Sequence, residues 1–426
     1  PAAGATQLSE RHGGVSRALT FRWPAAYQHV PSVDGMTIRP TEAAPQPFPG
    51  SLPRPPSDED RVARRARRRR LRRWIAALVL AALIPAGVSY ERALVYPGNA
   101  SFLVRTVEWI RDHGGGPLVD IAENVYYGLK APPNTAPAVG ALPEAAAPAA
   151  AAPAPLGTLS GTAALPGEGV WQAGPTVAGG TPGLYTTFIR PDAGHASVVA
   201  GVARFDQNVV GAHLIAGTRE PSGLGWPEGG KVPVALRAGL VATFNSGFKM
   251  KDANGGFLAD GRTAVSLRDG AASMVIDRTG RVTIGQWGRD VTNGPDVAAV
   301  RQNLALIIEN GKVVPGLDIN SGNSWGSAAS QLQYTWRSGV GIDTNGNLIY
   351  VGGDQLNLSS LAAALSQAGA VTAMELDIHG GMVDLFSYAH DGTGQLAGTP
   401  LLPTMSGAAN RYLVPDQRDF FAITAR

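Results

Sequence analysis

The chain of 426 residues has no cysteine and few charged residues. Without cysteine it can hold no disulfide framework, no thiolate metal site and no cysteine nucleophile. Charged residues make up 16% of the chain, below the share of about 25% in a typical globular protein. The formal net charge is +3, but removing the eight arginines between Arg64 and Arg73 leaves −5. The remainder is not the basic body of a nucleic-acid binder, so no nucleic-acid partner is expected.

Proline and glycine recur through residues 1–60, where no apolar periodicity marks a helix or a strand. Such a segment cannot bury a core. Residues 1–73 are therefore predicted to form a disordered cytoplasmic tail with an arginine-rich end. Met36 follows a stretch without structural signals and is a candidate natural start, which would make residues 1–35 an upstream extension.

The 17 residues from 74 to 90 contain no charge. This length is at the short end for a membrane-spanning helix, which takes about 20 residues. Trp74 and Tyr90 lie at its two ends, where aromatic side chains favour the membrane interface. Because the arginines precede the run, we predict a single-pass type II protein of the cell membrane, with residues 74–90 in the lipid bilayer and the C-terminal domain outside. A cleaved signal peptide and a basic nucleic-acid tail beside a buried helix are the alternatives.

Two connecting segments follow the predicted span. Residues 91–130 contain two amphipathic stretches, 102–110 and 119–127, which predict short juxtamembrane helices that pack against the membrane or the main domain. Residues 131–168 are rich in alanine and proline, a composition typical of a semi-rigid extended linker. This linker is expected to hold the next domain clear of the membrane.

The sequence pattern of residues 169–426 is typical of one α+β domain that is rich in β-strands. Short apolar runs alternate there with Gly, Asn and Asp turns. The clearest hairpin has two apolar runs joined by Asn310-Gly311. The strands expected in its first half are 197–205, 212–216, 271–276, 282–284, 304–308 and 313–314.

One stretch has a strand–helix–strand order. It consists of a strand at 348–352, a helix at 359–367 that begins at Ser359 or Ser360, and a strand at 371–378. This order predicts a βαβ unit.

The strand at 371–378 carries the best chemical signal. Side chains alternate between the two faces of a strand, so Glu375, Asp377 and His379 are expected on one face. Two carboxylates at this spacing can flank a scissile glycosidic bond, one of them kept protonated by the charge of the other. Gly380 and Gly381 then end the strand and let a ligand approach the backbone. The alternative is an ordinary polar outer face.

Two further polar groups are candidates for binding. Asn245, Gly247 and Lys249 follow an apolar run, where an asparagine can orient a substrate hydroxyl or form a plain Asx turn. Arg337 precedes a glycine-rich strand, where it can hold a phosphate or make a structural ion pair. The chain contains no P-loop and no His-Glu-x-x-His motif.

The order of these segments resembles the phosphodiester glycosidase family across most of residues 185–420. Asn245-Ser246-Gly247-Phe248-Lys249 corresponds to the family's Asn-Gly-Gly-Phe-Phe, and Arg337 to an arginine before a glycine-rich strand. Leu376 and Asp377 match the start of the family's Leu-Asp-Gly-Gly-Gly-Ser. This chain then departs from the motif, with Ile378-His379-Gly380-Gly381-Met382 in place of the glycines and serine.

The resemblance implies a hydrolase that cleaves sugar-1-phosphate diesters at the glycosidic bond. Asp377 is the implied general base or nucleophile, and Glu375 or His379 the general acid. Arg337 and Lys249 are expected to hold the phosphate. The residues predicted to bind substrate are Asn245, Gly247, Lys249, Arg337, Gly380 and Gly381.

Outside a membrane, the expected partners are glycosyl-phosphate linkages of cell-envelope glycopolymers or exopolysaccharide. A non-catalytic polysaccharide-binding module and a scaffold for envelope synthesis are the alternatives, because the motif has changed. No cofactor is evident. A divalent cation held by Asp343, Asp377 or His379 stays open, since these residues have no recognised ligand spacing.

Overall fold

The computed structural model describes residues 57–96, 100–128, 131–145, 152–159, 161–326, 331–390 and 395–426. The chain divides into two units, Pro1–Trp74 and Ile75–Arg426. The disordered tail predicted for residues 1–56, with the candidate start at Met36, lies outside the described residues.

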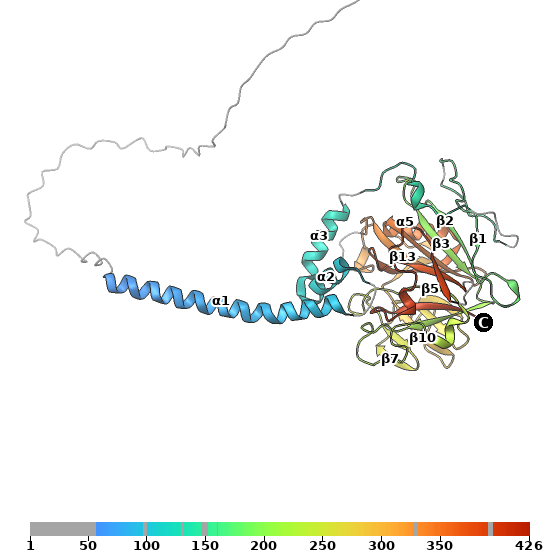
Figure 1. Ribbon diagram of the computed structural model, residues 1–426. Helices are drawn as coiled ribbons and strands as arrows, with labels where there is room; N and C mark the ends of the chain where they lie inside the picture. The colour runs from blue at the N-terminus through green and yellow to red at the C-terminus, as the bar shows by residue number, and fades with distance from the viewer. Residues whose placement is uncertain are drawn as a thin grey trace, which may run out of the picture. The chain divides into compact units, whose positions relative to one another are not determined.

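The first element is a long helix, α1 (Asp58–Val95), drawn in blue in Figure 1. The Ser57 hydroxyl accepts a hydrogen bond from the Asp60 amide at its start, and three acidic residues in the first turn favour the positive end of the helix dipole. Residues 58–73 are therefore helical, and the prediction of disorder was wrong for them. Arginine is a good helix former, which explains why the basic run continues the apolar helix.

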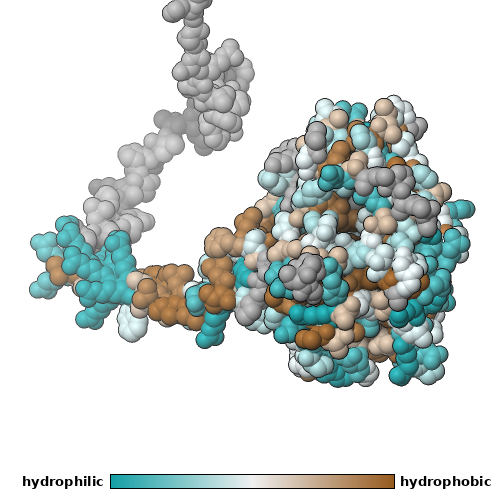
Figure 2. All heavy atoms as spheres, turned by 45° about the vertical axis from the view of Figure 1, so that its right-hand side comes forward, coloured by the Kyte–Doolittle hydropathy of each residue, from teal (hydrophilic) through white to brown (hydrophobic). Residues whose placement is uncertain are grey.

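The second half of α1 contains the predicted span. The helix is long and apolar enough to cross a membrane, with a mean hydropathy of 1.6 in its most apolar 18-residue window and none of that window buried. Figure 2 shows the two halves of this helix as a teal basic part and a brown apolar part.

Two short helices follow, as predicted, and they contact the end of α1. They are α2 (Phe102–Ile110) and α3 (Gly116–Gly128), joined by a π-helical turn. The Trp109 and Tyr90 rings meet edge to face with centroids 5.2 Å apart, and Trp109 Nε1 donates to Ser89 Oγ at 3.1 Å. These contacts hold α2 against the last turns of α1.

The described parts of the alanine- and proline-rich segment lie along the domain rather than projecting from it. The Ser197 hydroxyl donates to the Pro133 carbonyl at 2.7 Å, and Trp171 Nε1 donates to the Ala154 carbonyl at 3.0 Å. Leu156 packs against a buried core cluster. These residues of the linker predicted over 131–168 therefore pack on the domain, because apolar side chains and backbone groups of the segment find partners there.

The domain is α+β and rich in β-strands, as expected, and its described strands form three sheets. The first has eight strands in the order β1-β2-β3-β14-β13-β15-β11-β12, and the others have five each, β7-β6-β10-β8-β9 and β17-β16-β5-β18-β4. The strands are β1 (Gln172–Ala173), β2 (Leu184–Ile189), β3 (Ala200–Phe205), β4 (Val210–Ile215), β5 (Leu240–Asn245), β6 (Phe257–Ala259), β7 (Arg262–Val265), β8 (Ala272–Asp277), β9 (Val282–Gln286), β10 (Val297–Gln302), β11 (Leu306–Glu309), β12 (Lys312–Val313), β13 (Thr335–Asp343), β14 (Leu348–Leu356), β15 (Ala370–Ile378), β16 (Leu385–His390), β17 (Leu396–Pro400) and β18 (Phe420–Ala425).

The predicted hairpin is present between β11 and β12. Its turn residues Asn310 and Gly311 have φ angles of +50° and +73°, the left-handed conformations that this kind of tight turn requires. Asparagine and glycine adopt these angles at low cost, which is why the sequence signal was reliable here.

The strand–helix–strand order is also present, but the two strands are not neighbours. Strand β13 lies between β14 and β15 and pairs antiparallel with both, while helix α5 (Leu358–Gln367) connects them. The helix begins at an Asn357 cap, with Ser360 completing a capping box, rather than at Ser359 or Ser360. A methyl group at Gly339 would lie 2.9 Å from Leu365 Cδ1, so this glycine lets α5 pack closely on the sheet.

The largest core cluster joins the eight-stranded sheet to the other two. Phe244 of β5 belongs to it, with its ring 5.1 Å from that of Tyr350 and 5.2 Å from that of Phe421. These three rings come from β5, β14 and β18, so they connect two sheets next to Asn245, the last residue of β5.

Replacing Phe244 by alanine should lower the free energy of unfolding of the full chain by about 3–5 kcal/mol, because it leaves a cavity between the sheets. Denaturant unfolding in detergent, followed by near-ultraviolet circular dichroism, measures the change. Val313→Ala, on the exposed strand β12, is the control. Equal losses in the two variants would contradict this account of the core.

Candidate functional site

A β-bulge at the end of β15 separates two residues that the sequence placed on one face. On β13, Gly339 pairs with Glu375 of β15, and Arg337 pairs with Ile378 of β15. The step between these two pairs covers two residues on β13 but three residues on β15. The alternation of side chains is therefore broken between residues 375 and 378. As a result, the Glu375 and Asp377 carboxylates pair with different arginines.

Glu375 and Arg337 form a fully buried ion pair. Arg337 Nη1 lies 2.6 Å from Glu375 Oε1, and the other guanidinium nitrogens donate to the Leu356 carbonyl and the Gln331 amide oxygen. Burial raises the pKa of Glu375, against the charge of Arg337, which lowers it. Glu375 Oε2 is buried without a hydrogen-bond partner within the described residues, while the three guanidinium nitrogens of Arg337 are all bonded inside the domain. An acid role for Glu375 and a phosphate-binding role for Arg337 remain predictions.

Asp377 pairs with Arg418, at 2.8 Å between Oδ2 and Nη2. Its other oxygen accepts a hydrogen bond from the Ile378 amide at 2.9 Å. Burial raises the pKa of Asp377 to about 6, although the Arg418 charge opposes this, and Glu108 adds a repulsion that raises it further. A carboxylate with this pKa changes protonation close to neutral pH, as a general base should.

His379 follows the bulge in a left-handed conformation, with φ of +80°. Its Nε2 lies 3.5 Å from Glu123 of α3. Burial lowers the pKa of His379 to about 3, and the charges of Arg111 and Arg337 lower it as well. The imidazole is thus neutral at physiological pH. Its role as a proton carrier also stays a prediction.

The two glycines after His379 end the strand, as expected. Gly381 has a φ of +80°, and its carbonyl accepts a hydrogen bond from Arg411 at 2.8 Å. A side chain at Gly381 would meet Val104 of α2 at 3.5 Å, so this turn lies directly against α2.

Asn245 is buried at the end of β5 and uses all of its side-chain hydrogen-bonding groups internally. Its amide nitrogen donates to the Ser246 carbonyl and the Ser338 hydroxyl, and its oxygen accepts from Tyr350 and the Asp384 amide. Asn245 thus positions the strand ends in this structure, and its contact with a sugar hydroxyl stays a prediction.

The loop after Asn245 needs glycine at position 247. A methyl group there would lie 2.7 Å from the Asn303 side chain. Asn303 in turn donates to the Glu375 carbonyl at 3.0 Å and accepts from the Phe248 amide at 3.0 Å, so it ties this loop to β15. The sequence reasoning missed Asn303, since an isolated asparagine gives no signal.

Lys249 lies against α2 and the turn that follows it. Its Nζ contacts Glu108 and lies 3.1 Å from Asp112. Although burial raises the pKa of Asp112, the charges of Lys249 and Lys251 hold it below its usual value. This lysine is therefore neutralised by two carboxylates, one from α2 and one from the turn that follows it.

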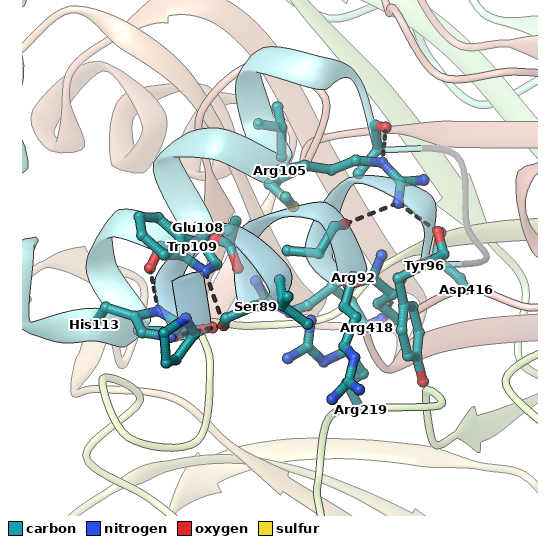
Figure 3. A pocket seen from close by; sticks show the side chains of 18 of the residues that line it. Ser89, Arg92, Tyr96, Arg105, Glu108, Trp109, His113, Arg219, Asp416 and Arg418 are labelled. Carbon is teal, nitrogen blue, oxygen red and sulfur yellow. Dashed lines mark hydrogen bonds between the residues drawn. The ribbon is translucent and has the colours of Figure 1, made fainter. Parts of the chain in front are cut away.

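Two cavities adjoin the Asp377–Arg418 pair, and Arg418 lines both. The first, of about 530 Å³, lies between α1, α2 and the loop before β18, and Figure 3 shows its side chains. The second, of about 390 Å³, is also lined by Lys249, Glu108 and Asp112. The geometry thus brings Asp377, Lys249 and Arg418 to one region, whereas Glu375 and Arg337 lie apart in their own buried pair.

The residues that sequence reasoning missed gather just before the last strand. Arg418 holds Asp377, and Arg411 bonds Asp384 at 2.7 Å and Asp416 at 2.9 Å. The only signal was a charged run, Asp416-Gln417-Arg418-Asp419, directly before an apolar strand. Such a run is often solvated, but here it is mostly buried.

Two other patterns have no matching structure. Within the described part of the chain, no three His, Asp or Glu side chains lie close enough to hold a metal ion, and Asp343 instead bonds Arg204 and Asn347. The residues from Gly322 to Gly326 have the Gly-x-Ser-x-Gly spacing of a nucleophile elbow. The first two of them belong to the 3₁₀ turn Ser321–Asn323, and no strand directly precedes this turn, as a nucleophile elbow would require.

Residues 231–393 match a protein-family model described as phosphodiester glycosidase. This segment is a phosphodiester glycosidase domain, as the sequence predicted. It contains every predicted site residue from Asn245 to Gly381, whereas Arg411 and Arg418 lie beyond its end. No curated protein matches the chain.

Three solved structures resemble the chain at low identity. One is the catalytic domain of zebrafish N-acetylglucosamine-1-phosphodiester α-N-acetylglucosaminidase, with 17% identity, a TM-score of 0.38, and coverage of 60% of this chain and 87% of that one. A protein of Synechocystis has 15% identity, a TM-score of 0.33 and coverage of 58% and 63%. An exported protein of Burkholderia pseudomallei has 14% identity, a TM-score of 0.28 and coverage of 53% and 74%.

Replacing Arg337 by methionine in the phosphodiester glycosidase domain should leave Glu375 buried without a counter-charge. Removing one partner of such a pair costs about 3–5 kcal/mol, so the free energy of unfolding should fall by that order. The double variant Arg337→Met/Glu375→Leu should recover most of the loss in a denaturant titration.

Arg289→Met, at an exposed ion pair with Glu309, is the matched control and should change stability little. If the double variant is no more stable than Arg337→Met alone, the buried pair is not what Arg337 contributes.

Proposed function

We propose that the domain hydrolyses the glycosidic bond of sugar-1-phosphate diesters, and that its substrates belong to cell-envelope glycopolymers or exopolysaccharide. One observation carries the proposal. Asp377, a buried carboxylate whose pKa is about 6, pairs with Arg418, which lines two cavities in a region that also contains Lys249. The family of residues 231–393 supplies the reaction class.

In this mechanism ionised Asp377 removes a proton from water as the oxygen attacks the anomeric carbon. The bond between the anomeric carbon and the phosphate oxygen breaks, and the phosphate monoester leaves with the electron pair. Arg418 and Lys249 stabilise the charge on that leaving group. A phosphate monoester leaves readily as an anion, so the reaction does not depend on a general acid. A neutral His379 and a buried Glu375 are therefore compatible with turnover.

The proposal places the domain outside a membrane, anchored by the apolar half of α1. The length and hydropathy of this helix support the anchor, and the arginines that precede the span support a type II orientation. Envelope glycans on that side of the membrane are the substrates that such an anchor would keep within reach.

Asp377→Asn should lower kcat by about 10²–10⁴, the range that general-base catalysis supplies. Release of free sugar from a panel of sugar-1-phosphate diesters, with the full chain in detergent, measures the rate. Asp354→Asn, at an exposed carboxylate, is the control and should keep full activity.

Full activity of Asp377→Asn on every diester that the parent protein cleaves would contradict this mechanism. Saturable binding of a diester without turnover in the parent protein would instead favour a polysaccharide-binding module. Neither binding nor turnover would favour a scaffold.

The rate should also depend on pH through Asp377. The base must be ionised, and its pKa of about 6 means that kcat/KM falls about tenfold per pH unit below that value. Glu108→Gln removes a negative charge that raises the pKa, so the acid limb should move to lower pH. Glu309→Gln is the control. An acid limb that stays in place in Glu108→Gln would show that another group sets it.

A further inference from the structure

The larger cavity has one apolar wall and one cationic wall. The apolar wall comes from α1, through Ile84, Pro85 and Val88. The opposite wall comes from the domain, through Arg219, Met382 and Arg418. A cavity of about 530 Å³ falls within the usual size range of small-ligand sites.

Three arginines in this cavity have charge or hydrogen-bonding capacity left over. Arg92 and Arg219 have no carboxylate partner within the described part of the chain, and Arg219 lies 5.1 Å above the Tyr96 ring. Arg418 is 8% exposed, and its Nε has no hydrogen-bond partner there, although its Nη2 bonds Asp377 and the Gly247 carbonyl. Figure 3 shows these three side chains lying together between Ser89 and Tyr96.

The three acidic residues that line the same cavity are already engaged. Asp416 accepts from Arg411 at 2.9 Å, Glu108 contacts Lys249, and Asp112 lies 3.1 Å from both Lys249 and Lys251. None of these carboxylates pairs with Arg92 or Arg219. An anionic group entering the cavity would meet a cluster of guanidinium groups, whose planar forks suit phosphate oxygens.

The position of the apolar wall decides which kind of phosphate fits. Ile84 and Val88 belong to the stretch that is apolar enough to cross a membrane, and Arg92 lies one helical turn beyond Val88, about 6 Å along the axis. A water-soluble polymer would gain nothing from that wall. A lipid chain would continue along it into the bilayer, while its phosphate stays at the level of Arg92 and Arg219.

We propose that this cavity binds a lipid-linked glycosyl phosphodiester, in which one phosphate joins a sugar to a lipid chain. The phosphate lies between Arg92, Arg219 and Arg418, and the sugar end points toward Asp377. That this ligand is the substrate rests on the proposed function. Hydrolysis then consumes one water, breaks the bond between the anomeric carbon and the phosphate oxygen, and yields free sugar and a lipid phosphate that remains in the membrane.

The test uses the full chain in phosphatidylcholine nanodiscs and two probes, the methyl and decyl diesters of N-acetylglucosamine 1-phosphate. The decyl diester should have a KM at least tenfold lower than the methyl diester. Ile84→Ala/Val88→Ala should raise the KM of the decyl diester about tenfold and leave that of the methyl diester within twofold. Val79→Ala/Leu80→Ala, on exposed positions of the same helix outside the cavity, is the matched control.

The two arginines proposed to hold the phosphate are tested with Arg92→Gln/Arg219→Gln. Both probes carry the phosphate, so this variant should weaken both, by about tenfold or more in KM. Arg278→Gln, at an exposed arginine outside the cavity, should change neither.

Binding is measured separately from turnover by tryptophan fluorescence, because Trp109 lines the cavity. A decyl diester brominated in its chain should quench the fluorescence of the Asp377→Asn protein saturably. The quenching should be lost in Trp109→Phe and weakened in Arg92→Gln/Arg219→Gln.

The outcomes separate the two proposals. Cleavage of both probes with equal KM values, unaffected by the α1 variants, would overturn the lipid-linked ligand and leave the glycosidase standing. Saturable quenching without cleavage of either probe by the parent protein would support the cavity as a lipid-phosphate site and reject the glycosidase. Absence of both signals would overturn both.

Discussion

The buried charges of this domain are neutralised by arginines that reach across its sheets. A charge in a dry interior is costly unless a partner lies within hydrogen-bonding distance, so each of these pairs fixes the position of two segments. Arg301 of β10 bonds Asp419 at the start of β18, and both are fully buried. Arg418, the neighbour of Asp419, bonds Asp377 at the end of β15. The two pairs thus connect all three sheets at the edge where the candidate site lies.

This arrangement gives the two carboxylates of β15 different surroundings. Asp377 is suited to acid–base chemistry, whereas Glu375 is enclosed in a buried ion pair. The bulge in β15 directs Glu375 to Arg337, where both side chains are fully buried. Asp377 instead lies next to an arginine that lines two cavities. Burial raises the pKa of Asp377 to about 6, and Arg418 limits that rise, so the carboxylate ionises near neutral pH. One local irregularity of the strand thereby separates a structural carboxylate from a candidate base.

Helix α2 and the turn after it are part of the same region. Glu108 and Asp112 contact Lys249, the lysine that the proposed mechanism assigns to the phosphate. A phosphate bound there would have to replace carboxylates that already satisfy the lysine. Helix α2 and the turn after it line the larger cavity together with the end of α1 and residues of the domain, among them Arg418, the partner of Asp377.

The sequence by itself determined the features that depend on neighbouring residues. The Asn310-Gly311 hairpin, the apolar span within α1 and the strand that carries Asp377 follow from local turn chemistry and periodicity, and the order of the motifs identified the family.

The tertiary structure alone decided which residues are partners in the buried ion pairs. Arg418 is 41 positions from Asp377 in the chain, and nothing near either residue predicts the contact. The bulge arises from pairing with β13, so alternation along β15 could not reveal it, and the alanine- and proline-rich segment packs on surfaces formed by residues far along the chain. Local patterns therefore predicted the strands, the turns and the candidate residues. The long-range pairing of buried charges decided which of these candidates lie beside the cavities.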